Sequence, residues 1–170
     1  MATAFPLLKL QEFDSQIDKA SQRLTVIDSA LNDKSQLSKA ENLHKAITAK
    51  LNSLTSDRKK LERNIEDLSG KMEAANKKIY GGIISSQKEL LAVEEEIRNI
   101  KELTDNSESQ LLEIMLECDR YQAGYKTSEE KLYQTRSEVE RETERLIKEK
   151  DDLGDFVSTN VPIRDNARQE

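Results

Sequence analysis

Few residues in this chain are of the types that usually carry catalysis or metal binding, and they lie far apart. His44 and Cys118 are the single histidine and the single cysteine among the 170 residues. Neither has a second His or Cys at the spacing that a zinc site requires. Both fall on an apolar helical repeat, so we interpret His44 as a helix-packing residue and Cys118 as a small buried thiol.

Other polar groups lack the surroundings of a catalytic or ligand site. Glu94, Glu95 and Glu96 are consecutive carboxylates, but an exposed helix face does not exclude water from them. The pair Gly81 and Gly82 lacks the G-x-x-x-x-G-K pattern of a phosphate-binding loop. We therefore expect a non-enzymatic protein, with no catalytic residue, no cofactor and no metal bound by these residues.

Arg58, Lys59, Lys60 and Arg63 form a basic cluster that raises the question of nucleic-acid binding. The chain has a net charge of −6, and no aromatic side chain stands within the cluster to stack on bases. We interpret the cluster as a solvated face or as the partner of an acidic segment. A nucleic-acid-binding accessory protein that uses this face is the alternative.

Apolar residues at seven-residue spacing predict the elements that position these groups. One frame runs from Leu90 to Leu153, a second from Leu37 to Ile79, and a third from Leu10 to Leu31. The second and third frames differ in register by one residue, and an interrupted repeat bends or breaks a coiled coil. We expect a kink or a short break near residues 31–38.

Residues 80–86 separate two helical arms and have the signals of a chain reversal. Gly81 and Gly82 permit positive φ values, and Ser86 with Glu89 forms the pattern of a capping box. Nine Lys/Arg and five Asp/Glu precede the turn in residues 45–78, whereas three and ten follow it in residues 85–119. These opposite net charges favour side-by-side pairing of the two arms.

The predicted fold is all-α, a long antiparallel coiled-coil helical hairpin. The hairpin occupies residues 1–155, with arms at 6–79 and 87–153 joined by the turn at 80–86. Residues 156–170 are expected to form an irregular tail. Charged residues make up 35% of the chain and aromatic residues only 4%, a balance that suits a seam between helices better than a globular core.

The stretch from Tyr80 to Glu117, "YGGIISSQKELLAVEEEIRNIKELTDNSESQLLEIMLE", resembles the hallmark segment of the bacterial C4-type zinc-ribbon family of unknown function. The opening "LLKLQEFDSQIDKASQRL" is similar to that family's Leu-Gln-x-x-Asp start. The resemblance implies a helical hairpin followed by a ribbon with two C-x-x-C pairs. These 170 residues contain no such pair, so zinc is expected only if a ribbon follows them.

The resemblance also implies a function, because some family members have been linked to sigma-factor handling, nucleic-acid binding and flagellar biogenesis. We expect an adaptor or scaffold that binds a protein partner, in transcription-factor or flagellar regulation. The expected contact is the hairpin tip: Tyr80, Gly81, Gly82, Ile83 and Ile84. A self-assembling structural coiled coil is a further alternative, with the chain a monomer or a dimer.

The expected location is the cytoplasm. No apolar run approaches the length that a membrane span needs, roughly 18 residues or more. The start of the chain also lacks the basic flank and the apolar core of a signal peptide.

Overall fold

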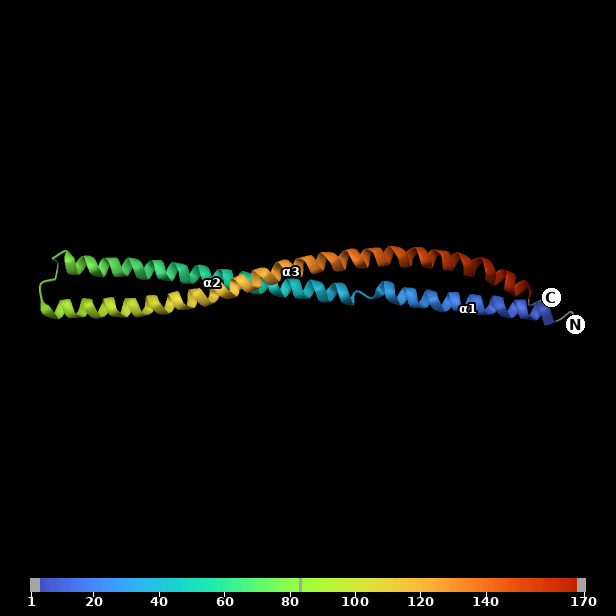
Figure 1. Ribbon diagram of the computed structural model, residues 1–170, viewed down its shortest axis with the longest axis horizontal. Helices are drawn as coiled ribbons and strands as arrows, with labels where there is room; N and C mark the ends of the chain where they lie inside the picture. The colour runs from blue at the N-terminus through green and yellow to red at the C-terminus, as the bar shows by residue number, and fades with distance from the viewer. Residues whose placement is uncertain (1–3, 83, 168–170) are drawn as a thin grey trace. The chain divides into compact units, whose positions relative to one another are not determined.

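The computed structural model describes residues 4–82 and 84–167 and consists of three α-helices (Figure 1). Helix α1 spans Ala4–Asn32, α2 spans Ser35–Tyr80 and α3 spans Gln87–Ala167, and the described ranges contain no strand. The chain reverses between α2 and α3, so that α3 returns antiparallel to the helices before it (Figure 1). The prediction of an all-α antiparallel hairpin is confirmed.

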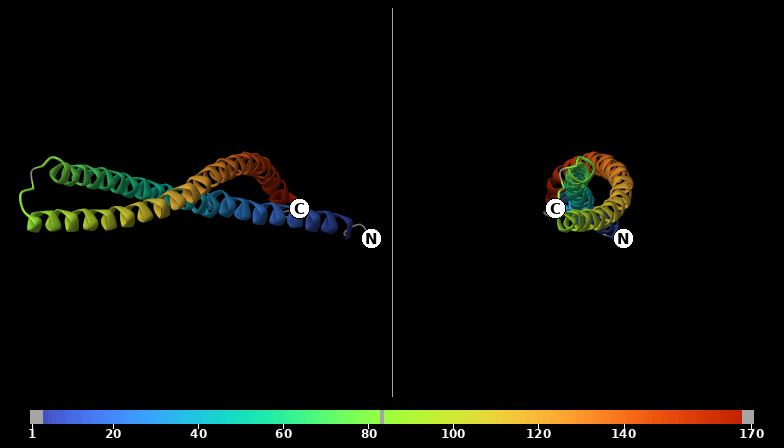
Figure 2. Two further views of the ribbon diagram at one scale, coloured as in Figure 1. Left: turned by 60° about the vertical axis from the view of Figure 1, so that its left-hand side comes forward. Right: turned by 90° about the vertical axis from the view of Figure 1, so that its left-hand side faces the viewer.

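The helices pack in two units. Unit 1 comprises residues 1–42 and 130–170, and unit 2 comprises residues 43–129. Unit 1 therefore pairs α1 and the start of α2 with the C-terminal part of α3. Unit 2 pairs the rest of α2 with the N-terminal part of α3, and Figure 2 shows these two segments side by side from two further directions.

The core of unit 1 follows the predicted repeat. Ile17, Ala20 and Ile27 of α1 and Leu146 of α3 are buried, and Ile27 has no exposed surface. Ion pairs flank this seam. The guanidinium of Arg23 donates two hydrogen bonds, of 2.6 and 3.0 Å, to the Glu149 carboxylate. Burial of the apolar stripe stabilises the pairing, and the ion pairs help to set its register.

A short break separates α1 from α2 at the predicted place. The Asp33 carboxylate accepts a hydrogen bond of 2.9 Å from the Ser35 backbone N–H, which caps the start of α2. Hydrogen bonding by Ser35, through its side chain and its backbone, lowers the pKa of Asp33. At the end of α1 the Asn32 side chain donates to the carbonyl of Asp28 at 2.9 Å. Polar side chains thus support both helix ends where the apolar repeat changes register.

The core of unit 2 combines apolar and polar layers. Leu54, Leu68 and Ala75 of α2 are buried, as is Ile100 of α3. The hydroxyls of Ser107 and Ser128 also occupy the seam, with only 7% and 6% of these residues exposed. Each of these two serine hydroxyls has a hydrogen-bond partner. No unsatisfied hydroxyl therefore destabilises the helix interface at these layers.

The turn between α2 and α3 is held on both sides by hydrogen bonds. The Gly81 N–H donates to the Lys77 carbonyl at 2.9 Å, and Gly82 has φ 69°, the one positive φ value in the described part of the chain. On the far side, the Ser86 hydroxyl accepts from the Glu89 N–H at 3.2 Å, as predicted.

The reciprocal half of the predicted capping box is shifted by one residue. The Glu89 carboxylate accepts from the backbone N–H of Ser85 at 3.2 Å. The capping-box pattern had predicted a bond to the N–H of Ser86 instead. The effect is similar to that of the predicted bond, because the Glu89 carboxylate still accepts a hydrogen bond from a backbone N–H that precedes the helix.

The predicted irregular tail is wrong for residues 156–167, because α3 continues through them. Side chains at helical spacing there are half-buried within unit 1: Leu153, Phe156, Val157, Asn160, Val161 and Arg164. Gly154 and Pro162 lower the local helix propensity, but this packing overrides them.

Candidate functional site

His44 takes part in a polar layer between the two helices of unit 2. Its Nδ1 atom lies 3.0 Å from the Ser128 hydroxyl, and its ring lies 4.9 Å from the ring of Tyr125, tilted by 48°. Ser128 donates its hydroxyl hydrogen to the Tyr125 carbonyl at 2.8 Å. Because that hydrogen is committed, Ser128 can only accept from His44, so Nδ1 carries a hydrogen. His44 therefore packs in the helix interface, as predicted.

The remaining candidates for metal or redox chemistry stand apart from one another. Cys118 is a free thiol and is half-buried, whereas the sequence predicted a buried one. Tyr121 and Tyr125 are half-buried in the seam, on the same apolar repeat as Cys118. Over residues 4–82 and 84–167, no three metal-ligating side chains come together.

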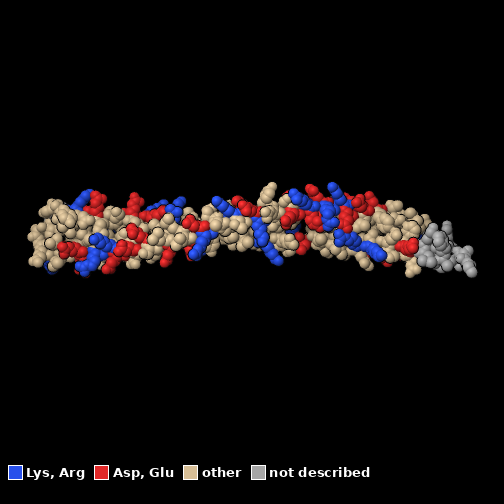
Figure 3. All heavy atoms as spheres, in the orientation of Figure 1, with Lys and Arg blue, Asp and Glu red and all other residues tan. Residues whose placement is uncertain are grey.

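The tip of unit 2 presents an exposed aromatic side chain beside the turn. Tyr80, the last residue of α2, is 86% exposed, and Gly81 and Gly82 beside it are also exposed. Ile84 is half-buried, and Ile83 lies outside the described residues. In the face shown in Figure 3, this end of unit 2, at the left, carries few charged side chains.

Leu91 is a tip residue that the sequence interpretation missed. It lies near the start of α3 and is 59% exposed, whereas its neighbour Leu90 lies in the seam and is half-buried. The signal was available in the sequence, because a heptad seam needs only one of two adjacent leucines. We call the set of Tyr80, Gly81, Gly82, Ile84 and Leu91 the tip surface.

The basic cluster is partly neutralised by carboxylates on its own helix. Glu62 lies 2.7 Å from Arg58 and raises the pKa of its guanidinium. Lys60 pairs with Asp57 at 2.8 Å, while Lys59 and Arg63 are exposed. These contacts leave about half of the cluster's positive charge available to a polyanion.

The expected ion pairing between the basic and acidic arms is sparse. In the described part of unit 2, the cross-helix ion pair joins Lys78 to Glu96 at 4.0 Å, the limit of such a contact. Unit 1 has several cross-helix pairs, including Lys150 with Asp28 at 2.7 Å. The opposite net charges beside the turn therefore act as a diffuse attraction, and the acidic side chains of α3 remain largely available to a partner.

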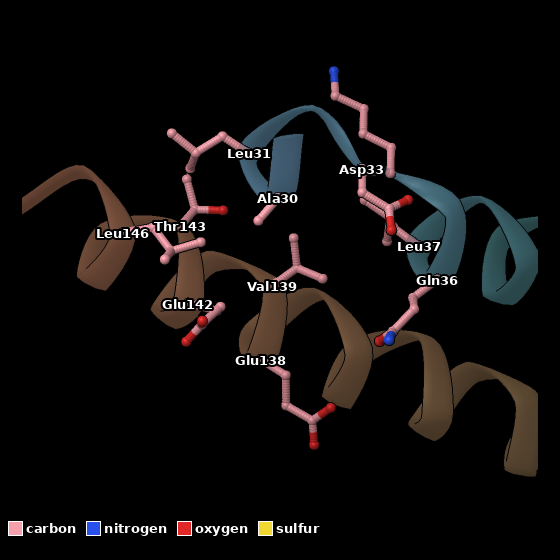
Figure 4. Close-up of a pocket in the computed structure, with 11 residues that line it drawn as sticks. Ala30, Leu31, Asp33, Gln36, Leu37, Glu138, Val139, Glu142, Thr143 and Leu146 are labelled. Atoms are coloured by element: carbon pink, nitrogen blue, oxygen red, sulfur yellow. The ribbon is translucent and has the colours of Figure 1, made fainter. Parts of the chain in front are cut away.

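A groove in unit 1 opens where the helix break faces α3 (Figure 4). Its volume is about 440 Å³, and its walls include Ala30, Leu31 and Leu37 on one side and Val139 and Leu146 on the other. Figure 4 shows Val139 pointing toward Ala30, while Glu138 points away from the groove. The groove is mainly apolar, and its ionisable lining residues are Asp33, Lys34, Glu138 and Glu142.

A second exposed apolar feature lies on α3, away from the tip. Leu112, Met115 and Leu116 are 62%, 38% and 62% exposed, although they sit in the same stretch as the half-buried seam residues Leu111 and Ile114. The sequence "LLEIML" contains more apolar residues than the seam uses, and this surplus is the signal that the sequence interpretation overlooked.

Comparison with known proteins supports the fold. The structure resembles the solved structure of the HP0958 protein from Helicobacter pylori CCUG 17874, with a TM-score of 0.61. The two chains are 18% identical, over a match that covers 97% of this chain and 69% of the other. No protein-family model and no curated protein sequence matches the chain. At this low sequence identity, the structural similarity supports the helical architecture alone.

Within the described residues, no helix has an apolar stretch long enough to cross a bilayer.

Proposed function

We propose that this chain is a non-enzymatic helical adaptor that binds a protein partner through the tip surface of unit 2. The observation that carries the proposal is Tyr80, which is 86% exposed at the end of α2. Tyrosine combines a large apolar area with a polar hydroxyl, and it is enriched among the residues that dominate binding energy at protein interfaces.

The local structure favours binding at the tip because hydrogen bonds hold the two helix ends that flank the turn before a partner arrives. The N–H of Gly81 donates to Lys77 on one side, and the N–H of Glu89 donates to Ser86 on the other. A preorganised surface loses less conformational entropy on binding than a mobile loop does. Leu91, also exposed, adds apolar area at the same end of unit 2.

Two other functions predicted from the sequence receive less support. Nucleic-acid binding would use the basic cluster, but Glu62 and Asp57 already hold Arg58 and Lys60. Self-assembly into a structural coiled coil would need an apolar face that complements itself, and the carboxylates around Leu112, Met115 and Leu116 oppose this. The role in transcription-factor or flagellar regulation, the cytoplasmic location and a zinc ribbon beyond Glu170 rest on the sequence interpretation and stay predictions.

A binding experiment with matched tyrosine variants tests the proposal. Affinity-tagged chain is incubated with extract of the source cells, and the proteins retained by wild type, Tyr80→Ser and Tyr133→Ser are compared. Tyr133 is the control because it is 76% exposed but lies in unit 1. We expect Tyr80→Ser to lower the recovery of a specific protein by about tenfold, since loss of a dominant contact costs at least about 1–2 kcal/mol. Equal recovery by all three chains would argue against a tip contact.

A further inference from the structure

The outward face of α3 in unit 2 carries a compact apolar patch that the helical hairpin leaves uncovered. Leu112, Met115 and Leu116 stand at i, i+3 and i+4, so they form one surface on adjacent turns of the helix. We call these three residues the outer patch. They are distinct from the seam, which is built on the same helix from Leu111 and Ile114. Three large apolar side chains together on an exposed helix face are typical of an interaction site.

The outer patch is framed by carboxylates that make no close ion pair. The helical period places Asp105 and Glu108 on the same face before Leu112, and Asp119 on that face after it. Residues 102–119 contain no Lys or Arg, and their acids are Glu102, Asp105, Glu108, Glu113, Glu117 and Asp119. None of these six makes an ion pair of 4.0 Å or less with another described residue. The patch is therefore an apolar centre with a mainly acidic frame, in which Arg120, four residues after Leu116, is a basic residue.

A second copy of this chain fits the outer patch poorly. Pairing of α3 with α3 would bring two acidic frames together, and like charges oppose association. Helix α2 of a second copy has the complementary basic charge, but between residues 44 and 79 its described residues include no exposed large apolar side chain. Such a face would meet the outer patch with polar groups and would leave the leucines without an apolar contact.

We infer that the outer patch is a docking site for a basic amphipathic helix of another protein. A stripe of apolar residues at i, i+3, i+4 and i+7 on that helix packs against Leu112, Met115 and Leu116. Lysine or arginine beside the stripe faces Asp105, Glu108 and Asp119. The face from residue 105 to residue 119 accommodates a helix of about 15 residues, roughly 22 Å long. The methionine adapts its shape to different apolar surfaces.

Fluorescence anisotropy with a synthetic peptide tests this inference on the full chain. The probe is a labelled peptide of about 15 residues with leucines at helical spacing and lysines elsewhere. The control probe has the same composition, with its leucines spread around the helix. Leu112→Gln with Leu116→Gln removes the patch, and Leu103→Gln with Ile147→Gln is the matched control on the same helix, where these two side chains are 54% and 46% exposed. Circular dichroism confirms that each variant remains helical.

The inference predicts that the amphipathic peptide binds wild type and the control variant within about twofold, and the patch variant at least about tenfold more weakly. Replacing Asp105, Glu108 and Asp119 by their amides weakens binding and flattens its dependence on salt. Absence of binding to wild type, equal binding of the control peptide, or equal binding to the patch variant overturns the inference. Concentration-dependent dimerisation of wild type that the patch variant loses also overturns it, because the occupant is then a second copy.

Discussion

The Nδ1 atom of His44 lies 3.0 Å from the hydroxyl oxygen of Ser128, across the interface between α2 and α3. A second polar pair, Asn64 with Ser107 at 3.1 Å, crosses the same interface. Polar pairs inside an apolar seam specify register, because a shifted pairing leaves a buried polar group without a partner. These two layers therefore fix how α2 and α3 align, and thereby which residues meet at the tip of unit 2.

The His44 layer predicts a single tautomer of the imidazole. Ser128 donates to the Tyr125 carbonyl at 2.8 Å. It therefore accepts from His44, and the neutral ring carries its hydrogen on Nδ1. Nitrogen NMR of the labelled chain measures this directly, since His44 is the single histidine. The spectrum of the neutral ring should show a protonated Nδ1 and an unprotonated Nε2. The opposite pattern would mean that Ser128 does not hold the ring in this way.

The Asn64–Ser107 layer predicts coupled effects on stability. Asn64→Ala leaves the buried Ser107 hydroxyl without its partner, and this should lower the free energy of unfolding by about 1–2 kcal/mol. The double variant with Ser107→Ala should cost less than the sum of the two single variants, by about 0.5–1.5 kcal/mol. Urea unfolding of the four chains gives these values. Additive costs would show that the two side chains do not interact across the seam.

Two glycines of unit 2 should respond to alanine in opposite directions. Gly82 has φ 69°. Gly82→Ala therefore forces a side chain into the left-handed region and should destabilise the chain by about 1 kcal/mol. Gly70 lies within α2, and an added Cβ would meet nothing within 4 Å there. Gly70→Ala should therefore stabilise the chain by about 0.5–1 kcal/mol. Urea unfolding measures the stability of both variants. Equal changes of the same sign in their free energies of unfolding would contradict the proposed turn geometry.

The Arg23–Glu149 ion pair predicts a pH-dependent contribution to stability. Hydrogen bonding by Arg23 lowers the pKa of Glu149 in the folded chain. Because its pKa is lowered in the folded chain, ionised Glu149 stabilises the fold at pH values above the usual glutamate pKa of about 4.3. This contribution is lost as the pH falls through the lowered pKa.

Melting temperatures of wild type and Arg23→Gln test that contribution between pH 7 and pH 3. Wild type should be the more stable chain near neutral pH, and the difference should shrink below about pH 4. Arg63→Gln is the control, because Arg63 makes no ion pair with any other described residue within the 4.0 Å that limits such contacts. A difference that persists undiminished at pH 3 would assign the effect of Arg23 to packing.

The local pattern of the sequence accounts for most of the fold. Apolar spacing predicted the helices, and the two glycines with Ser86 predicted the turn. The change of register predicted a kink or a break near residues 31–38, and the structure has a break there, between Asn32 and Ser35. Each of these signals involves residues close together in the chain. Beyond Leu153 local signals mislead, because Gly154 and Pro162 disfavour a helix and packing within unit 1 overrides them.

The candidate binding surfaces could be predicted less fully from the sequence than the fold could. The pairing of Arg23 with Glu149 joins residues 126 positions apart, so it depends on the register of the hairpin. Which leucines in "LLEIML" remain exposed likewise depends on the side of α3 that α2 covers. Tyr80 was predicted as part of the tip because it adjoins the turn, and its large exposure follows from its position at the last residue of α2.

Site-specific photo-cross-linking in the source cells tests the central claim most directly. A photoreactive phenylalanine analogue replaces Tyr80 in one chain and Tyr133 in another, since both tyrosines are highly exposed, at 86% and 76%. The adaptor proposal predicts a discrete cross-linked protein from position 80 that is absent or much weaker from position 133. Identical products from both positions, or no product from position 80, would contradict binding of a protein partner at the tip of unit 2.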